Sequence, residues 1–339
     1  MTIHSKYGKI KKYVIKTIVD LRRKQHKIRE EVMSLIQAII MGIIQGLTEF
    51  LPVSSSGHLA LFKNLFHVDI ETGILFDVLL HVGTLLAICI VFYKDIFRMI
   101  AEGIGMLCDA LVNCVLFFRN VFLYLSNSGK KGKKANEELA YSDYRKVVIS
   151  GYRKFVMLII VSTIPTGIIG IVGKKVVEQA QDILLIPGIC LVITAILLFV
   201  ADFCKDGDKI PKDITYSNAF GIGIVQGIAV LPGLSRSGAT ITACLVSGFN
   251  RKFAVKYSFL MSIPAILGAM LVELKDFDKL AVSSSELTCY VVGMLIAAVI
   301  GFICIKITLA IVKNKKFRGF AIYCLIVGCI SIGGFFYLV

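Results

Sequence analysis

The sequence predicts an all-α polytopic membrane protein made of two inverted-topology repeats, with about six spanning helices and two re-entrant helical hairpins. Three observations lead to this prediction. The 339 residues are 56% hydrophobic and only 18% charged, with a mean hydropathy of +0.79, whereas a typical soluble domain is about 25% charged. Several apolar runs reach the length of a spanning helix. Two further apolar segments are interrupted by the same pattern of small and polar residues.

Six apolar runs are long enough to cross a bilayer, which takes about 20 mostly apolar residues. They are Ile74–Tyr93, Phe155–Gly173, Ile183–Ala201, Phe253–Val272, Leu287–Val312 and Phe320–Val339. The segment 101–125 is also apolar but carries Glu102, Asp109, Asn113 and Arg119. We expect it to form an interfacial helix or a shallow hairpin, because one more spanning helix would reverse the orientation of everything that follows.

Two apolar segments, near 33–66 and 218–249, are broken by Pro, Gly and Ser. Backbone that is not helical at membrane depth survives only where protein or a water-filled cavity surrounds it. The breaks therefore predict re-entrant hairpins inside the helix bundle. Two kinked spanning helices remain the alternative.

The two breaks share one pattern. A Gln-Gly pair, Leu-Pro and Ser-x-Ser-Gly follow one another from Gln45 to Gly57 and again from Gln226 to Gly238, 181 residues later. This offset divides the membrane chain into a first repeat, 33–182, and a second, 183–339. Each half holds one break and about three spans, and an odd number of spans inverts one half relative to the other, as in inverted-repeat transporters.

Charge predicts the orientation. If the hairpins return to their own side, the loops at 94–154, 205–212 and 313–318, with Arg251 and Lys252, share one side. From Met33 onward these carry 20 Lys and Arg against 5 on the other side, which marks the basic side as cytoplasmic. The basic insertion at about 101–150 then faces the cytoplasm. Residues 1–32 form a basic N-terminal extension with interleaved apolar residues, which is not typical of a nucleic-acid site. Two interpretations stay open: an amphipathic helix on an anionic lipid surface, or a stretch ahead of the true start, since Met33 opens the hydrophobic chain.

The first break carries acid–base chemistry. Gln45 and Glu49 are four residues apart and share a helical face. A carboxylate in the middle of a membrane segment costs about 2.5–3.5 kcal/mol on insertion scales, which makes Glu49 a candidate functional residue. The hydroxyls of Ser54, Ser55 and Ser56 follow at once. His58 then adds an imidazole that can titrate near neutral pH.

The second break carries anion-binding chemistry. Arg236 lies between Ser235 and Ser237, with Thr240 one turn further, ahead of an apolar helix. A guanidinium beside hydroxyls and helix N-terminal amides is typical of a phosphate site. If the breaks converge, acid–base groups face an anion clamp, which favours phosphoryl transfer.

These stretches, "QGLTEFLPVSSSGH" and "LPGLSRSGAT", resemble the two signature segments of the undecaprenyl-diphosphatase family, the bacitracin-resistance proteins. The resemblance continues through "FDVLLHVGTLLA", "TIPTGIIG", "YSFLMSIPAILGA" and "GFAIYCLIVG", and covers Met33 to Val339. Gln45 stands where the family has Glu or Gln, and Ser56 stands where the family has Thr. Residues 1–32 and much of 101–145 look like additions to the family pattern.

The resemblance implies an integral enzyme of the inner membrane with its site open to the extracytoplasmic side. Its substrate would be undecaprenyl diphosphate, which loses one phosphate to give the monophosphate carrier of cell-wall precursors. A divalent cation, Mg²⁺ or Ca²⁺, is implied, with Glu49 as its ligand. Whether the protein is a homo-oligomer is left open.

The expected mechanism places the diphosphate between Arg236, the hydroxyls of Ser235 and Ser237, and a cation held by Glu49. His58 acts as acid or base, and the attacking group is either Ser55 or a water molecule. The rival hypothesis is a polyprenyl-phosphate flippase with the same inverted-repeat anion site. A pure carrier would need the clamp but would have no need of Glu49 and His58 beside it.

Overall fold

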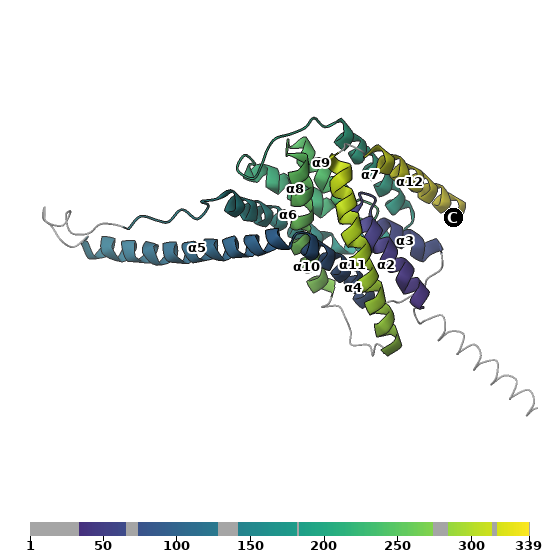
Figure 1. Ribbon diagram of the computed structural model, residues 1–339, viewed down its shortest axis with the longest axis horizontal. Coiled ribbons are helices and arrows are strands. Elements are labelled where there is room, and N and C mark those ends of the chain that lie inside the picture. Colours follow the sequence, from purple (N-terminus) through teal and green to yellow (C-terminus); the bar gives the residue numbers. More distant parts are fainter. Residues whose placement is uncertain are drawn as a thin grey trace, which may run out of the picture.

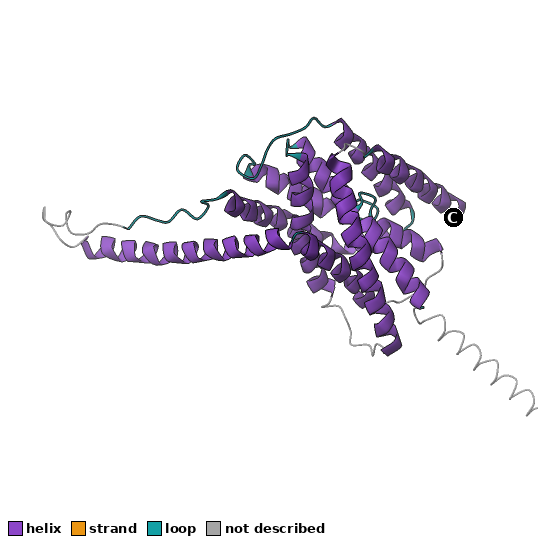
Figure 2. Cartoon of the chain, viewed as in Figure 1, coloured by secondary structure: helices purple, strands orange, loops and turns teal. Residues whose placement is uncertain are grey.

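The computed structural model describes residues 34–65, 74–127, 142–181, 183–273, 284–313 and 317–338. Within these ranges the chain forms eleven helices (Figures 1 and 2). The only β-structure there consists of two isolated bridges between residues 207–209 and 249–250. The helices are α2 (Leu35–Phe50), α3 (Ser55–Leu65), α4 (Ile74–Val91), α5 (Tyr93–Asn127), α6 (Gly151–Gln181), α7 (Leu185–Phe203), α8 (Tyr216–Ile228), α9 (Arg236–Val246), α10 (Arg251–Glu273), α11 (Ser284–Lys313) and α12 (Arg318–Leu338). The all-α class is confirmed.

Six of the described helices are long and apolar enough to cross a membrane: α5, α6, α7, α10, α11 and α12. Five of them contain predicted spans. The sixth predicted span, Ile74–Tyr93, corresponds to α4, which is apolar but shorter because it ends at Val91. The number of long apolar helices agrees with the sequence, but α5 takes the place of α4 among them.

Both breaks are turns between short helices. The four helices around them, α2, α3, α8 and α9, have 16, 11, 13 and 11 residues, fewer than the about 20 that a span needs. The two helices of each pair also pack against each other. This geometry is that of two re-entrant hairpins rather than two kinked spans.

The contacts between helices follow a two-fold pattern. A helix of the first half contacts a helix of the second half, and the corresponding helices of the two halves make the corresponding contact. α2 packs along α11, and its counterpart α8 packs along α6; α4 contacts α11 as α10 contacts α6; α7 packs on α12. The five helices α2, α3, α4, α6 and α7 thereby correspond to α8–α12, and α5 has no counterpart. This pattern supports two repeats and groups α7 with the first of them, whereas the predicted boundary at residue 182 placed α7 in the second. The inverted orientation of the repeats in the bilayer stays a prediction.

Glycines at equivalent positions allow these close contacts. A Cβ on Gly42 of α2 would lie 2.5 Å from the Gly293 carbonyl oxygen of α11, and a Cβ on Gly223 of α8 would lie 2.1 Å from the Ser162 carbonyl oxygen of α6. Gly42 and Gly223 are again 181 residues apart. Small residues at the interface let membrane helices approach to backbone contact, so each broken segment is held against a long helix.

The segment 101–125 belongs to one continuous helix, α5, of 35 residues. The alternative of a shallow hairpin is therefore wrong, because no residue in this range interrupts the helical hydrogen bonding. α5 projects from the bundle and runs across the direction of α11 (Figure 1). The extension 1–32 lies outside the described residues.

We predict that Gly223→Ala lowers the melting temperature of the purified protein in detergent, because the added methyl must displace the backbone of α6. Overpacking of this kind costs roughly 1–3 kcal/mol. The matched control is Gly221→Ala on the same helix, where a Cβ meets nothing within 4 Å. This control should be neutral or slightly stabilising, since alanine favours a helix over glycine by up to ~1 kcal/mol. Equal melting temperatures for the two variants would contradict the close packing of α8 on α6.

Candidate active site

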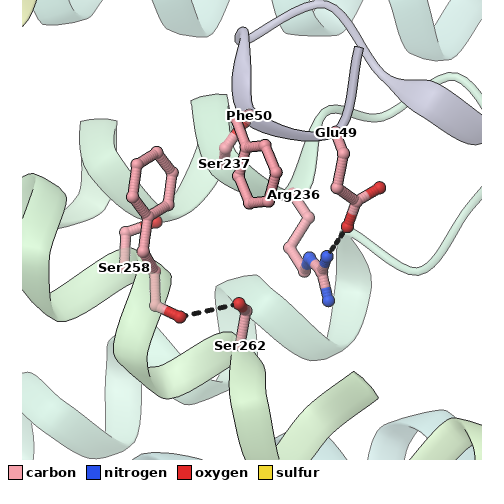
Figure 3. A pocket seen from close by; sticks show the side chains of 7 residues that line it. Glu49, Phe50, Arg236, Ser237, Ser258 and Ser262 are labelled. Carbon is pink, nitrogen blue, oxygen red and sulfur yellow. Dashed lines mark hydrogen bonds and ion pairs between the residues drawn. The ribbon is translucent and has the colours of Figure 1, made fainter. Parts of the chain in front are cut away.

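The two breaks meet at an ion pair between a buried carboxylate and a partly buried guanidinium. Glu49 lies in the last turn of α2, and Arg236 is the first residue of α9. The Arg236 guanidinium donates a hydrogen bond to Glu49 Oε1 (Figure 3). Around this pair lies a pocket lined by Glu49, Phe50, Arg236, Ser237, Ser258, Phe259 and Ser262. The prediction that the two halves build one polar site is thus matched by direct contact between them.

Serine caps place the two helices that follow the breaks. The Ser54 hydroxyl accepts a hydrogen bond from the Gly57 amide (3.3 Å), and the Ser235 hydroxyl accepts one from the Gly238 amide (3.1 Å). Each cap satisfies an amide that the first helical turn leaves without a partner. Ser54 has a positive φ of 73°, an uncommon conformation for a residue other than glycine and one that often occurs at functional sites.

The turns also touch each other reciprocally. A Cβ on Gly57 would lie 2.8 Å from Gly233 Cα, and one on Gly238 would lie 3.3 Å from Pro52 Cβ. Gly233 lies 181 residues after Pro52 and directly follows Pro232, the proline of the second Leu-Pro pair. The first turn of α3 therefore packs on the second break, and the first turn of α9 packs on the first break. This contact fixes the distance between Glu49 and Arg236.

Glu49 is buried, and three side chains satisfy its carboxylate. Besides Arg236 on Oε1, Ser55 Oγ donates to Oε2 at 2.6 Å and Gln45 Nε2 donates to Oε2 at 3.1 Å. Two of the partners come from the first break and one from the second. A carboxylate in contact with a hydroxyl can take its proton, which is the arrangement that activates a nucleophile.

His81 on α4 belongs to the site and was missed from the sequence. Its Nδ1 lies 3.1 Å from Gln45 Nε2. An amide nitrogen only donates, so His81 Nδ1 accepts, and the Gln45 amide is oriented by Glu49 on one side and His81 on the other. The signal was a lone imidazole in the apolar run "FDVLLHVG".

His58 lies close in sequence but has other partners. Its Nδ1 donates to the Ser54 carbonyl oxygen at 2.7 Å, and its Nε2 lies 2.7 Å from the Tyr323 hydroxyl of α12. The two rings are stacked, with centroids 5.5 Å apart. Both ring nitrogens are thus engaged, and the Ser55 hydroxyl contacts Glu49 and not His58.

Of the other predicted binding residues, one lines the pocket and the others contact neighbouring protein groups. Ser237 lines the pocket, and its hydroxyl lies 3.4 Å from the Leu51 carbonyl oxygen. Thr240 links α9 to α10: its Oγ1 donates to the Arg236 carbonyl oxygen at 2.8 Å and lies 2.6 Å from Ser258 Oγ. The Ser56 hydroxyl lies 3.4 Å from the Ser54 hydroxyl. Ser258 and Ser262 of α10 line the pocket and were not singled out from the sequence.

The side chains of the site offer few oxygen ligands for a metal ion, so a bound cation would need the substrate phosphates as further ligands. No group of three or more His, Cys, Asp or Glu side chains able to hold a metal occurs among the described residues. Two neighbouring side chains carry oxygen donors: the Glu49 carboxylate, and the Gln45 amide that bonds it through Nε2, whose Oε1 is a buried atom without a hydrogen-bond partner. The same is true of Gln226 Oε1 in the second half, where no carboxylate accompanies it. Hard cations such as Mg²⁺ bind through one or two carboxylates plus substrate phosphates, and the residues fit that mode.

The family comparison agrees with this geometry. A family model described as "Bacitracin resistance protein BacA" matches residues 38–330, which includes both breaks. The chain belongs to the BacA family. Curated relatives carry the name undecaprenyl-diphosphatase. Those of Methanosphaera stadtmanae and Alkaliphilus metalliredigens are each 39% identical over 300 residues, or 88% of this chain and 98% of theirs. That of Methanobrevibacter smithii is 36% identical over 303 residues, 89% of this chain and 98% of its own.

The residues of the candidate site lie in the part of the chain that matches the BacA family model. The match spans nearly the whole described bundle, so Glu49, Ser55 and Arg236 lie within the family's shared region. The multi-pass membrane architecture expected from the resemblance is confirmed by the six long apolar helices.

Proposed function

We propose that this protein is an undecaprenyl-diphosphatase, which hydrolyses undecaprenyl diphosphate to undecaprenyl phosphate and inorganic phosphate. This reaction recycles the lipid carrier for cell-wall synthesis and gives resistance to bacitracin. The observation that carries the proposal is the convergence of Ser55 and Arg236 on the buried carboxylate of Glu49. A nucleophile with its base, beside a guanidinium that can grip phosphate, is what phosphoryl transfer requires.

In the first step Ser55 Oγ attacks the terminal phosphorus while Glu49 takes the hydroxyl proton. The bond from this phosphorus to the bridging oxygen breaks, and undecaprenyl phosphate leaves with the electron pair. Arg236 turns from Glu49 to the phosphate oxygens, where its planar fork binds two of them. The amides at the N-terminus of α9 face the same anion. The contact of 2.6 Å between Ser55 and Glu49 supports the serine, rather than a water molecule, as the attacking group.

In the second step water hydrolyses the phosphoserine. Glu49 first passes the proton it took from Ser55 to the departing undecaprenyl phosphate. It then accepts a proton from the attacking water, the bond between phosphorus and Ser55 Oγ breaks, and Glu49 returns that proton to Ser55 Oγ as inorganic phosphate leaves. Ser237, Ser258 and Ser262 offer hydroxyl donors to the phosphate along the pocket wall. His58 acts as a positioning residue, because its bonds to the Ser54 carbonyl and to Tyr323 hold the turn that carries Ser55. Ser54 and Ser235 have the same supporting role as helix caps.

A divalent cation, Mg²⁺ or Ca²⁺, belongs to the proposal through Glu49 and Gln45. When bound, it would neutralise charge on the diphosphate oxygens. Glu49 Oε2 and the unpaired Gln45 Oε1 are the protein oxygens that would hold it, with the substrate supplying further ligands.

A flippase is the weaker reading of the same site. A carrier needs the anion clamp of Arg236, but it gains nothing from a serine hydroxyl bonded to a buried carboxylate. In the enzyme that pair has a chemical task. The site is further proposed to open to the extracytoplasmic face of the inner membrane, as the basic cytoplasmic loops suggest. Hydrolysis of an impermeant short-chain diphosphate by intact cells would check that side.

Arg236→Lys should lose roughly tenfold to a hundredfold in kcat/KM for phosphate release from undecaprenyl diphosphate. Lysine keeps the charge but loses the two-point grip on phosphate. A hydrogen bond to a charged group is worth roughly 1.5–3 kcal/mol, and 1.36 kcal/mol is tenfold in rate. Arg236→Ala should lose more. Wild-type activity in Arg236→Ala, in protein that elutes as the native species, would remove the second break from the reaction.

Ser55→Ala should lose at least about a hundredfold in turnover, because proton transfer by a positioned base is worth about 10²–10⁴-fold and no hydroxyl remains for Glu49 to activate. The matched control is Ser56→Ala, one residue on and without a bond to Glu49; it should stay near wild type. Acid quenching of the wild-type reaction should trap phosphate on Ser55. An active Ser55→Ala enzyme would assign the attack to water and leave the diphosphatase activity itself standing.

Gln45→Glu should be active and should reach half-maximal activity at a lower cation concentration than wild type. The variant places a second carboxylate beside Glu49, which a bound cation stabilises and an empty site does not. Gln226→Glu, at the equivalent buried position without a partner carboxylate, is the control and should leave cation dependence unchanged. The measurement is phosphate release during titration of Mg²⁺ or Ca²⁺ into chelator-treated protein. An unshifted titration curve would count against a cation at Gln45 and Glu49.

A further inference from the structure

Helix α5 forms an arm outside the repeated bundle. It runs away from the other helices, and a loop at 142–150 returns along it toward α6 (Figure 2). We call this loop the strap. Neither α5 nor the strap has a counterpart in the second half, and neither contributes a residue to the pocket of the active site.

The strap is bound to one stripe of α5 by paired hydrogen bonds. The side-chain amide of Asn113 bonds both backbone groups of Arg145 (2.8 and 2.7 Å), and that of Asn120 bonds both backbone groups of Ser142 (3.1 and 3.2 Å). Seven helical residues rise about 10.5 Å, and three extended residues span about 10 Å. The spacing of the two asparagines thus matches the spacing of the two strap residues that they hold.

Ion pairs occupy the rest of the same stripe. Arg153, near the start of α6, bonds Glu102 Oε2 at 3.1 Å and Asp109 Oδ2 at 2.6 Å. The Arg145 side chain reaches Asp109 from the strap at 3.4 Å. The residues Glu102, Asp109, Asn113 and Asn120 follow at intervals of seven, four and seven, which keeps them on one face. The polar face of α5 is therefore satisfied within the protein.

The opposite face of α5 is apolar and uncovered. Its large side chains are each more than half exposed: Phe97, Ile100, Ile104, Leu107, Leu111, Val115, Phe118 and Phe122. Their intervals of three and four residues make one continuous stripe. The stripe continues the exposed Leu86 and Ile90 of α4, which lie on the apolar outer surface of the bundle. Lys94 and Arg119 lie beside it, where they can reach anionic head groups.

Although α5 is long and apolar enough to span a bilayer, the strap excludes that position. An extended segment beside a spanning helix would expose its peptide groups to hydrocarbon, and lipid-exposed irregular backbone does not occur there. Only two strap residues are paired by the asparagines. The strap therefore requires head groups or water, while the apolar stripe on the opposite face requires acyl chains. A helix lying in the interface meets both demands, and α5 runs across the direction of α11 (Figure 1).

We propose that α5 and its strap form a lipid-surface arm that lies flat in one leaflet of an anionic membrane. The apolar stripe enters the acyl chains just below the head groups, as amphipathic helices do at a depth of about 5–10 Å. The strap faces the head groups, and Lys94 and Arg119 bind their phosphates. This surface extends the contact of the bundle with lipid well beyond the spanning helices, independently of the reaction at Glu49.

The protein contains no Trp, so one introduced Trp reports depth in the full-length chain. Phe97→Trp, Leu111→Trp and Phe122→Trp place it at both ends and near the middle of the stripe. Each variant is reconstituted in vesicles of phosphatidylcholine and phosphatidylglycerol, with lipids brominated at a shallow or a deep position of the acyl chain. All three should be quenched more strongly by the shallow bromine and should report the same depth.

The control is Tyr144→Trp on the strap, an exposed aromatic side chain. It should be quenched by aqueous iodide and little by either brominated lipid. A deep position for Leu111→Trp between shallow end positions would show a spanning helix and overturn the proposal. Weak quenching of all three stripe variants by both lipids would show that protein, such as a second copy, covers the stripe, and would overturn it equally.

Discussion

The site depends on a carboxylate that is buried among membrane helices and compensated from the far half of the chain. An isolated charge in such a place is costly, and removing one partner of a buried pair leaves the other uncompensated. Glu49 is tolerated because Arg236, Ser55 and Gln45 all bond it. The same bonds bring a hydroxyl, a carboxylate and a guanidinium to one point, and these are the groups that the proposed phosphoryl transfer uses.

The contact between the breaks depends in turn on small residues. Gly57 and Gly238 let the first turns of α3 and α9 touch the opposite break, and Gly42 and Gly223 let α2 and α8 lie against long helices. The positions repeat at an interval of 181 residues. The chemistry does not repeat with them: Glu49 corresponds to Val230, and Arg236 corresponds to Ser55. The two halves thus share one backbone framework, and in the proposed reaction the first half supplies the acid–base groups and the second half supplies the phosphate-binding groups.

The arm shows how an addition can be accommodated without disturbing that framework. α5 follows α4 after the single residue Phe92, whose amide still bonds Ile88 in helical fashion. Its polar stripe is satisfied by its own strap and by Arg153. The active-site pocket receives nothing from it. An insertion that satisfies its own polar groups and offers its apolar face to lipid leaves the two-fold contacts of the bundle intact.

The sequence by itself determined the membrane class, the positions of both breaks, their repetition, and the residues Glu49 and Arg236. These follow from composition and from spacing along one chain segment, where helical periodicity and capping rules act locally. The tertiary structure alone decided which groups touch. In it Glu49 bonds Ser55 and not His58, and His58 instead lies against Tyr323. His81, Ser258 and Ser262 also reach the site. The tertiary structure also makes 101–125 part of one helix with a strap. These contacts join residues far apart in the chain, so helix packing and not local pattern sets them.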